Sequence, residues 1–276
     1  MRHSIRSLLG RSLRTVQSPR RLRVEELERR DTPTPMASTL YVNDNWVDVN
    51  GGSLVAGDTV TSTEPGAPVS AIFGTNAFKT INSAIAAATP YATVQVLQGT
   101  YTENVTIDKP LALLGAQNGV AVGGRTIGGA AESVIVAPDK IVTGKTSTTN
   151  TNDVIRILAD DVIVDGFTVS GNTKSVAGIS NTPVTGSPFD AHYLTISNDF
   201  IRNAIDDISL ATLSSAYVQN NSIEVAKNGI GIQVASQTGN SSAAVYVIAN
   251  TVYAAAGVIA KGDQYCPAIC RITTAV

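Results

Sequence analysis

Short apolar runs separated by polar or glycine-containing breaks dominate the chain after residue 90. In residues 94–116, VQVLQGTYTENVTIDKPLALLGA, the runs VQVL, NVTI and LALL follow one another closely. Runs of this length, rich in Val, Ile and Leu, predict β-strands. The segments between them are too short for the crossover helix that parallel strands ordinarily need. A coil that carries three strands and stacks on copies of itself removes that need, because each strand then pairs one turn of chain later.

One segment departs from the strand pattern. Residues 76–90, NAFKTINSAIAAATP, place apolar side chains at helical spacing, with Asn76 positioned as an N-cap and Pro90 as a stop. They predict the only helix of the body, at about 77–88. A helix there is expected to cover the first coil, whose strand edges would otherwise be open to other chains.

Aspartate and asparagine recur at one point of the strand pattern. An Asp or Asn stands two residues before an apolar strand residue in DGFTV, NDFIRN, NSIEV and NTVYA. The repeats are 33, 23 and 29 residues apart, as expected for coils that carry loop insertions. We expect these side chains to hydrogen-bond from coil to coil, in a structural ladder of Asp165, Asn198, Asn221 and Asn250.

Two stretches carry a family resemblance. Residues 78–116, FKTINSAIAAATPYATVQVLQGTYTENVTIDKPLALLGA, resemble the opening of the pectin-lyase-like right-handed parallel β-helix superfamily. Residues 162–172, VIVDGFTVSGN, are similar to repeats of its NosD-like and carbohydrate-binding or sugar-hydrolase groups. The resemblance, over about residues 41–260, implies an all-β fold: a right-handed parallel β-helix of about six coils with an N-terminal capping helix. This fold hosts lyases, hydrolases, esterases and surface spacers alike.

Charge divides the chain into a basic leader and an acidic body. Residues 1–36 carry nine Arg against four acidic residues, net +5, and the other 240 residues carry net −7. An acidic body argues against nucleic acid as a partner, because tracking a phosphate backbone needs a basic stripe. No run of eighteen apolar residues is present, so no transmembrane helix is predicted. The expected organisation is a leader and Pro/Thr linker at 1–36, a β-helix at 37–260 and an irregular tail at 261–276.

The leader has a specific order of residues. RRLRVEELERRDTPTP, residues 20–35, resembles the N-terminal tag of exported and surface proteins of planctomycete bacteria. That tag has a basic run, then Val-Glu-x-Leu-Glu-x-Arg, then a Thr/Pro-rich exit. The resemblance implies export to the cell surface or the extracellular space. By composition alone the first 24 residues also suit a mitochondrial transit peptide, and a disordered basic leader is the remaining alternative.

The tail holds the only two cysteines, Cys266 and Cys270. A small disulfide loop in an oxidising compartment and a pair of free thiols are both open interpretations. No second cysteine pair or nearby His completes a metal-ligand set there.

Candidate chemistry appears first in GTYTENV, residues 99–105, which matches the Gly-x-Tyr-x-Glu motif of pectin methylesterases. The esterase segments that carry the catalytic Asp, Gln-Asp-Thr-Leu and Asp-Phe-Ile-Phe-Gly, have no counterpart in this chain. The motif also recurs in β-helices that are not esterases, as a strand-turn signal. We therefore interpret it as structural.

Acidic residues and an arginine gather at 199–207. Asp206 and Asp207 resemble the paired aspartates of polygalacturonase-type hydrolases, without the accompanying Gly-His-Gly and Arg-Ile-Lys segments. A Ca²⁺-dependent polysaccharide lyase would use carboxylates such as Asp199 for the metal and Arg202 as base. The lyase signatures Trp-x-Asp-His and Arg-x-Pro-x-x-Arg are also absent. Turn carboxylates and a solvated ion pair are the structural alternatives for these four catalytic candidates.

Three functional hypotheses follow from the sequence. The first is an exported, non-catalytic spacer or carbohydrate-contacting module, with a polysaccharide or cell-surface glycan as partner. The second is a Ca²⁺-dependent polysaccharide lyase or a glycoside hydrolase that acts on acidic polysaccharides. The third is a truncated, inactive family member, which an uncovered last coil would support. Self-association through the last coil is a further possible partnership. Convergence of the four catalytic candidates in one outward groove would favour the enzyme, and scattered or inward side chains would favour the first hypothesis.

Overall fold

Short strands make up most of the computed structural model, which describes residues 38–139, 152–181, 191–210, 215–226, 229–234 and 245–254. Sheet A contains β1 (Thr39–Val42), β5 (Ala77–Phe78), β6 (Ala92–Val96), β9 (Leu111–Leu114), β12 (Val162–Asp165), β15 (Leu194–Ser197), β18 (Ala216–Gln219) and β21 (Val245–Ile248). Sheet C contains β7 (Gly99–Thr102), β10 (Ser133–Val136), β13 (Phe167–Ser170), β16 (Phe200–Arg202), β19 (Ser222–Val225) and β22 (Thr251–Ala254). Sheet D contains β8 (Val105–Ile107), β11 (Ile155–Ile157), β14 (Ala177–Ser180), β17 (Asp206–Leu210) and β20 (Ile230–Val234).

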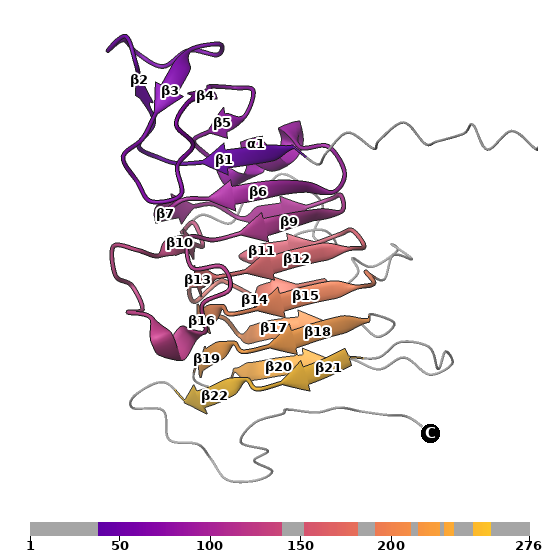
Figure 1. The fold of residues 1–276 in the computed structure, drawn as a ribbon. Helices are drawn as coiled ribbons and strands as arrows, with labels where there is room; N and C mark the ends of the chain where they lie inside the picture. The colour runs from indigo at the N-terminus through magenta and orange to yellow at the C-terminus, as the bar shows by residue number, and fades with distance from the viewer. Residues whose placement is uncertain are drawn as a thin grey trace, which may run out of the picture. The chain divides into compact units, whose positions relative to one another are not determined.

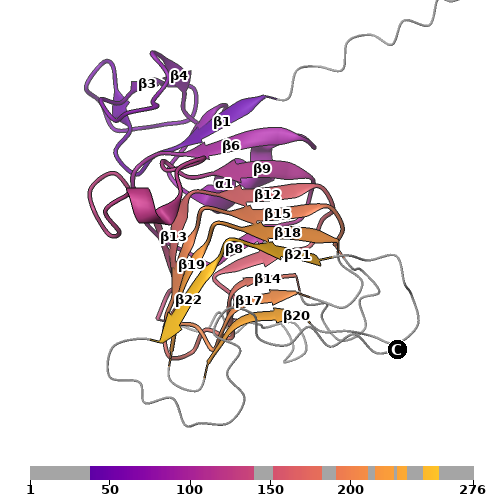
Figure 2. The same ribbon diagram turned by 60° about the horizontal axis from the view of Figure 1, so that its bottom comes forward.

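The chain passes through sheets A, C and D in turn and then repeats the circuit (Figure 1). All pairings within the three sheets are parallel, so each strand lies beside its counterpart one coil later. Six coils begin at β6, β9, β12, β15, β18 and β21, and Figure 2 shows the sheets as separate walls around an interior. The predicted all-β parallel β-helix is confirmed.

The strands of one coil differ from the three expected in residues 94–116. VQVL lies in sheet A and NVTI in sheet D, but LALL returns to sheet A, where Leu113 pairs with Val94 of the preceding coil. The middle strand of the coil is GTYT, which is β7 of sheet C. Its polar side chains hide it from a search for apolar runs, because only Tyr101 of this strand faces the core.

Inward side chains of the three sheets form one continuous apolar core. Within sheet A a fully buried row runs from coil to coil in register, through Val94, Leu113, Val164, Ile196 and Val218. Burial of each such side chain contributes about 1.5–3 kcal/mol. The residues that alternate with this row along the strands therefore point outward.

Helix α1 (Ile81–Ala87) begins later than predicted. Its N-cap is Thr80, whose Oγ1 accepts a hydrogen bond from the amide of Ser83 at 3.2 Å. Asn76 does not cap the helix, because residues 77–78 pair with β1 as a strand and Asn76 Oδ1 accepts from Ile72 N at 2.7 Å. The predicted span of 77–88 is therefore wrong at its start. The helix packs against β1, β5, β6 and β8.

The Gly-x-Tyr-x-Glu motif fastens this helix to the first coil. Glu103 accepts hydrogen bonds from Ile81 N at 2.8 Å and from Asn82 N at 3.0 Å. The carboxylate thus satisfies two amides that the first helical turn leaves without partners. The buried Tyr101 hydroxyl lies 3.0 Å from the carbonyl oxygen of Leu97. The motif is accounted for by these structural contacts.

A small antiparallel sheet of β2 (Val47–Asp48), β3 (Thr59–Thr61) and β4 (Ala71–Ile72) precedes the helix. It has its own apolar cluster around Trp46, whose indole nitrogen donates to the Phe78 carbonyl at 2.9 Å.

The leader at 1–36 and the tail at 261–276, with Cys266 and Cys270, lie outside the described residues. Within the described ranges, no helix has the length and apolar character needed to cross a membrane.

Candidate functional site

The outward side chains of sheet A form two parallel rows, which we call the sheet A face. They come from seven strands, β1, β6, β9, β12, β15, β18 and β21, and they alternate with core residues on each strand. The first row is Thr39, Thr93, Ala112, Ile163, Thr195, Tyr217 and Tyr246. The second row is Tyr41, Gln95, Leu114, Asp165, Ser197, Gln219 and Ile248. The face is polar at β1 and β6 and aromatic at β18 and β21.

A pocket of about 390 Å³ opens at the polar end of the sheet A face. This volume lies in the range of small-molecule sites. Gln95 is held in place there, because its side-chain nitrogen donates to the carbonyls of Leu114 and Gly115 at 3.3 and 3.1 Å. The pocket is lined by Thr39, Tyr41, Pro65, Gly66, Thr93, Gln95, Ala116 and Asn118. Most of its polar groups are hydroxyls and amides, which suit hydroxyl-rich ligands.

One wall of the pocket belongs to residues 116–132, the crossing loop, which joins β9 of sheet A to β10 of sheet C and contains the short 3-10 helix η1 (Val122–Gly124). The loop passes directly over Gly166, whose φ is +85°. A Cβ at Gly166 would collide with the backbone of Gln117 and Asn118. Asp165 fixes the same segment, because its Oδ1 accepts from Gly119 N at 3.1 Å. Glycine at 166 is therefore required for the wall of the pocket.

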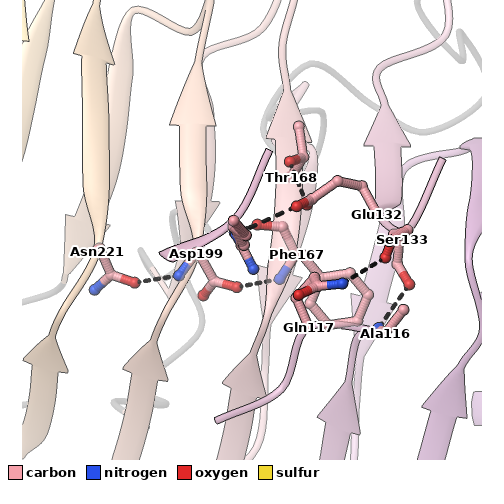
Figure 3. A network of polar contacts seen from close by, with 10 residues as sticks. Ala116, Gln117, Glu132, Ser133, Phe167, Thr168, Asp199 and Asn221 are labelled. Atoms are coloured by element: carbon pink, nitrogen blue, oxygen red, sulfur yellow. Dashed lines mark hydrogen bonds and ion pairs between the residues drawn. The ribbon is translucent and has the colours of Figure 1, made fainter. Parts of the chain in front are cut away.

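Buried charges hold the far part of the crossing loop. Arg125 Nη2 donates to the Phe167 carbonyl at 2.8 Å, and Arg125 Nε lies 3.4 Å from Glu132 Oε1. The other carboxylate oxygen of Glu132 accepts from Thr168 Oγ1 at 2.9 Å (Figure 3). Arg125 and Glu132 side chains are almost fully buried. Burial also lowers the pKa of the Arg125 guanidinium, although Glu132 opposes that shift. Such a pair is costly to break from one side, so it secures the loop.

A hydrogen-bonded row runs from coil to coil and contains two of the four predicted ladder residues, Asn221 and Asn250. Asn250 Oδ1 accepts from Asn221 Nδ2 at 3.0 Å, and Asn221 Oδ1 accepts from Asp199 N at 2.9 Å. Asp199 Oδ1 in turn accepts from Phe167 N at 2.8 Å, so the row continues into the third coil (Figure 3). The in-register member of the fourth coil is therefore Asp199, and the prediction of Asn198 is wrong by one residue.

Asn198 and Asp165 lie beside the ladder. Asn198 occupies the left-handed turn region, with φ of 55°, which asparagine adopts more readily than most residues. Its side-chain nitrogen donates to Asp165 Oδ1 at 2.9 Å. Asp165 pairs in register with Ser197 of sheet A, so it belongs to the sheet A face.

Asp199 takes the position that asparagine holds in the next two coils. There Asn221 and Asn250 each donate from Nδ2 to a carbonyl of sheet A, Ile196 at 2.9 Å and Val218 at 2.7 Å. Asp199 is fully buried, and its Oδ2 has no hydrogen-bond partner among the described residues. Burial raises the pKa of Asp199 well above its ordinary value. A protonated carboxyl, able to donate as an asparagine does, fits this position.

The four catalytic candidates do not converge outward. Asp199 lies inside the ladder, and Asp207 is fully buried in sheet D, between Gly178 and Gly231 of the neighbouring strands. A Cβ on either glycine would meet core side chains, so this row faces the interior. Burial raises the pKa of Asp207 to about 8.

The other two candidates are nearer the surface. Asp206 is half-buried, and burial raises its pKa. Arg202 points outward from sheet C, with its guanidinium carbon 5.7 Å from the centroid of the Phe200 ring. Among the described residues, no hydrogen bond or ion pair joins any two of the four candidates.

Tyr217 and Tyr246 are the prominent side chains that sequence reasoning misses. Their rings stack with centroids 4.9 Å apart and planes inclined by 13°. Each ring is about half exposed, at 49%. The signal that could have found them is the ladder, because each tyrosine lies four residues before a ladder Asn, at 221 and 250.

The described part of the chain gathers no group of three or more His, Cys, Asp or Glu side chains able to hold a metal ion.

Comparisons with known proteins place this β-helix in a family. The family model described as "Protein of unknown function (DUF1565)" matches residues 71–269. The chain belongs to the DUF1565 family. No curated protein matches this DUF1565 chain.

Solved structures similar to the DUF1565 chain include pectin methylesterases. The enzyme from Aspergillus niger in its deglycosylated form is 14% identical, covers 80% of this chain and 57% of its own, and gives a TM-score of 0.47. PemA from Erwinia chrysanthemi is 18% identical, covering 59% of this chain and 47% of its own at a TM-score of 0.38. A pectin methylesterase in complex with hexasaccharide VII is 14% identical, covering 79% of this chain and 66% of its own at 0.43. The DUF1565 chain thus spans 57% of the first of these structures, and no residue role is carried over from them.

Proposed function

We propose that this protein is an exported, non-catalytic β-helix module that binds polysaccharide on the sheet A face. The observation that carries the proposal is the pocket of about 390 Å³, which opens onto an outward face that continues across seven strands. A long and mostly uncharged face suits an extended chain of sugars. Hydroxyl and amide groups at the pocket would bond sugar hydroxyls, and tyrosines would pack on their apolar faces.

The fixed wall of the pocket supports this function. Arg125 and Glu132 anchor the crossing loop through buried contacts, and Gly119 is bonded to Asp165. A preorganised pocket loses little entropy when a ligand binds, which favours recognition.

Two observations speak for binding without cleavage. A glycosidase or lyase needs carboxylates or a base that reach the sugar, whereas Asp199 and Asp207 are enclosed in the protein. Glu103 of the esterase-like motif is occupied at the start of α1. Export is proposed from the order of residues in the leader at 20–35.

The test combines binding and product formation in one panel. The full chain is run by affinity electrophoresis through gels that contain neutral or acidic polysaccharides, with and without Ca²⁺. The same mixtures are assayed for unsaturated sugar ends by ultraviolet absorbance, for new reducing ends and for released methanol. We expect retardation by at least one polysaccharide and no product. Accumulation of any product would overturn the non-catalytic function, and the absence of retardation in every gel would overturn the binding function.

A further inference from the structure

The geometry points to a subsite for one sugar ring of a neutral polysaccharide, above Thr195 and between Ile163 and Tyr217. This inference rests on the proposed function and gives it a location and a ligand class. The three residues lie in register on β12, β15 and β18 of the sheet A face. We call this space the Thr195 notch.

The width of the notch suits a pyranose ring. Neighbouring strands lie about 4.8 Å apart, so Ile163 and Tyr217, two strands apart, are separated by about 10 Å. A saturated ring packs against carbon atoms at about 3.5–4.0 Å on each side, which fills that width. Thr195 is the smallest of the three side chains and forms the floor. Ile163 and Tyr217 are 39% and 49% exposed, which makes them accessible walls.

The stacked rings of Tyr217 and Tyr246 form one wall of the Thr195 notch. Tyr246 covers the ring of Tyr217 on the β21 side, at 4.9 Å between centroids. The opposite face of Tyr217 is turned toward β15, over Thr195. The stack also holds the Tyr217 ring in one orientation, which lowers the entropy lost on binding. The negative face of an aromatic ring attracts the C–H groups on the apolar face of a sugar.

Polar groups border the notch along the second row of the face. Gln219 stands beside Tyr217, and its side chain makes no hydrogen bond in the described ranges, so both its donor and its acceptor can serve sugar hydroxyls. Asp165 lies next to Ile163; its Oδ1 already accepts from Gly119 N and Asn198 Nδ2, so Oδ2 is the oxygen to which a sugar hydroxyl would donate. Hydroxyl groups on the sugar could therefore be bonded from one side while its apolar face packs on Tyr217.

The charge of the sheet A face and of the body favours a neutral glycan. Asp165 is the only charged residue in the two rows, and neither row contains Lys or Arg. Residues 37–276 carry net −7, so the surface repels a polyanion such as a polyuronate. The described residues also gather no metal-ligand group that would bridge the like charges. The occupant best matched to the notch is an uncharged polysaccharide.

The experiment uses the full chain and four proteins: wild type, Tyr217→Ala, Thr195→Tyr and Tyr253→Ala. Tyr217→Ala removes a wall. Thr195→Tyr fills the notch by extending the aromatic stack, without removing anything from the core. Tyr253→Ala is the matched control, because Tyr253 is a similarly exposed tyrosine on sheet C, at 43%. Circular dichroism and urea midpoints confirm that each variant folds.

Affinity is measured by gel retardation with galactomannan, arabinoxylan and mixed-linkage β-glucan as neutral probes, and with polygalacturonate and alginate as acidic probes. We expect at least one neutral probe to bind. Both notch variants should weaken that binding by about tenfold or more, the size of one lost stacking contact, and Tyr253→Ala should leave it unchanged.

The outcomes separate this inference from the proposed function. Binding to acidic probes only, or neutral binding that survives both notch variants, overturns the notch and leaves glycan binding standing. No binding to any probe overturns the proposed function itself. A concentration-dependent dimer that Tyr217→Ala abolishes in size-exclusion chromatography would assign the notch to a second copy of the chain and overturn the inference.

Discussion

Replacing Asp207 by Asn tests whether a carboxyl group is enclosed in sheet D. Asp207 is fully buried. Burial, opposed by a hydrogen bond from the backbone of Ala204 and supported by the charges of Asp206 and Glu224, raises its pKa from the ordinary 3.8 to about 8. The folded protein therefore keeps a proton on Asp207 that the unfolded chain releases between those two pH values.

The sign and size of the effect follow from this difference. Where the folded state binds the extra proton, the free energy of unfolding falls as pH rises, by about 1.4 kcal/mol per pH unit. Between pH 5 and pH 7.5, both inside the window set by 3.8 and about 8, Asp207 should remove about 3 kcal/mol of stability. Below the ordinary pKa of aspartate the contribution is constant. Asp207→Asn cannot ionise, so the variant should lack this loss.

The assay is urea unfolding of wild type and Asp207→Asn at a series of pH values from 5 to 7.5, with Asp108→Asn as control. Asp108 is exposed, with 63% of its side chain accessible, and the control should keep the wild-type pH dependence. The free energy of unfolding of Asp207→Asn, relative to that of wild type, should increase steadily as pH rises. Parallel curves for wild type and Asp207→Asn would refute the reasoning and place the carboxylate in contact with water.

Three further predictions concern the parts that build the pocket and the first coil. Glu103→Ala should lower the free energy of unfolding in urea by about 1–2 kcal/mol, because two helix amides lose their acceptor; an unchanged midpoint would contradict the capping role. Gly166→Ala should lower the thermal midpoint sharply or prevent folding, because its Cβ would collide with the crossing loop, and a wild-type midpoint would contradict that path. Arg125→Met should cost about 3–5 kcal/mol in urea unfolding, because Glu132 keeps a buried charge without its partner. Adding Glu132→Gln should restore part of that loss, and no restoration would contradict the ion pair.

The coil architecture could be predicted because it depends on a repeated local pattern. Apolar runs such as LALL mark strands that bury alternate side chains, and Asn221 and Asn250 mark one turn of successive coils. The division of the coil into sheets was harder to predict. GTYT contributes one inward side chain, Tyr101, to the core and was hidden among polar residues. The sequence pattern places LALL in the coil that it follows, because the spacing of apolar runs does not show where one coil ends and the next begins.

The sequence predicts the wrong residue at single positions where a second suitable residue lies nearby. Asn198 and Asp199 both fit a polar ladder, and only the pairing register shows that Asp199 occupies it. Asn76 and Thr80 both suit a helix N-cap. Thr80 is the cap because residues 77–78 pair with β1 as a strand, so the helix begins after them. The pairing of strands in the folded protein determines these positions, and a local sequence pattern carries no information about that pairing.

The candidate site could not be predicted from chemistry-bearing residues alone. Their charge makes Asp206 and Asp207 catalytic candidates, but Asp207 is fully buried and does not reach the surface. The sheet A face instead joins residues from seven strands that are far apart in sequence. Tyr217 and Tyr246 become neighbours only after the coils stack. A face built from one or two residues per coil leaves no compact motif in the sequence.

Hydroxyl-radical footprinting of the full chain with a bound polysaccharide tests the central claim most directly. Oxidation of each exposed tyrosine is measured by mass spectrometry with and without the glycan that gives the strongest retardation. The sheet A face predicts protection of Tyr217 and Tyr246, whose rings are each 49% exposed, and unchanged oxidation of Tyr253 at 43%. Protection of Tyr253 with no change at Tyr217 and Tyr246 would contradict binding on the sheet A face.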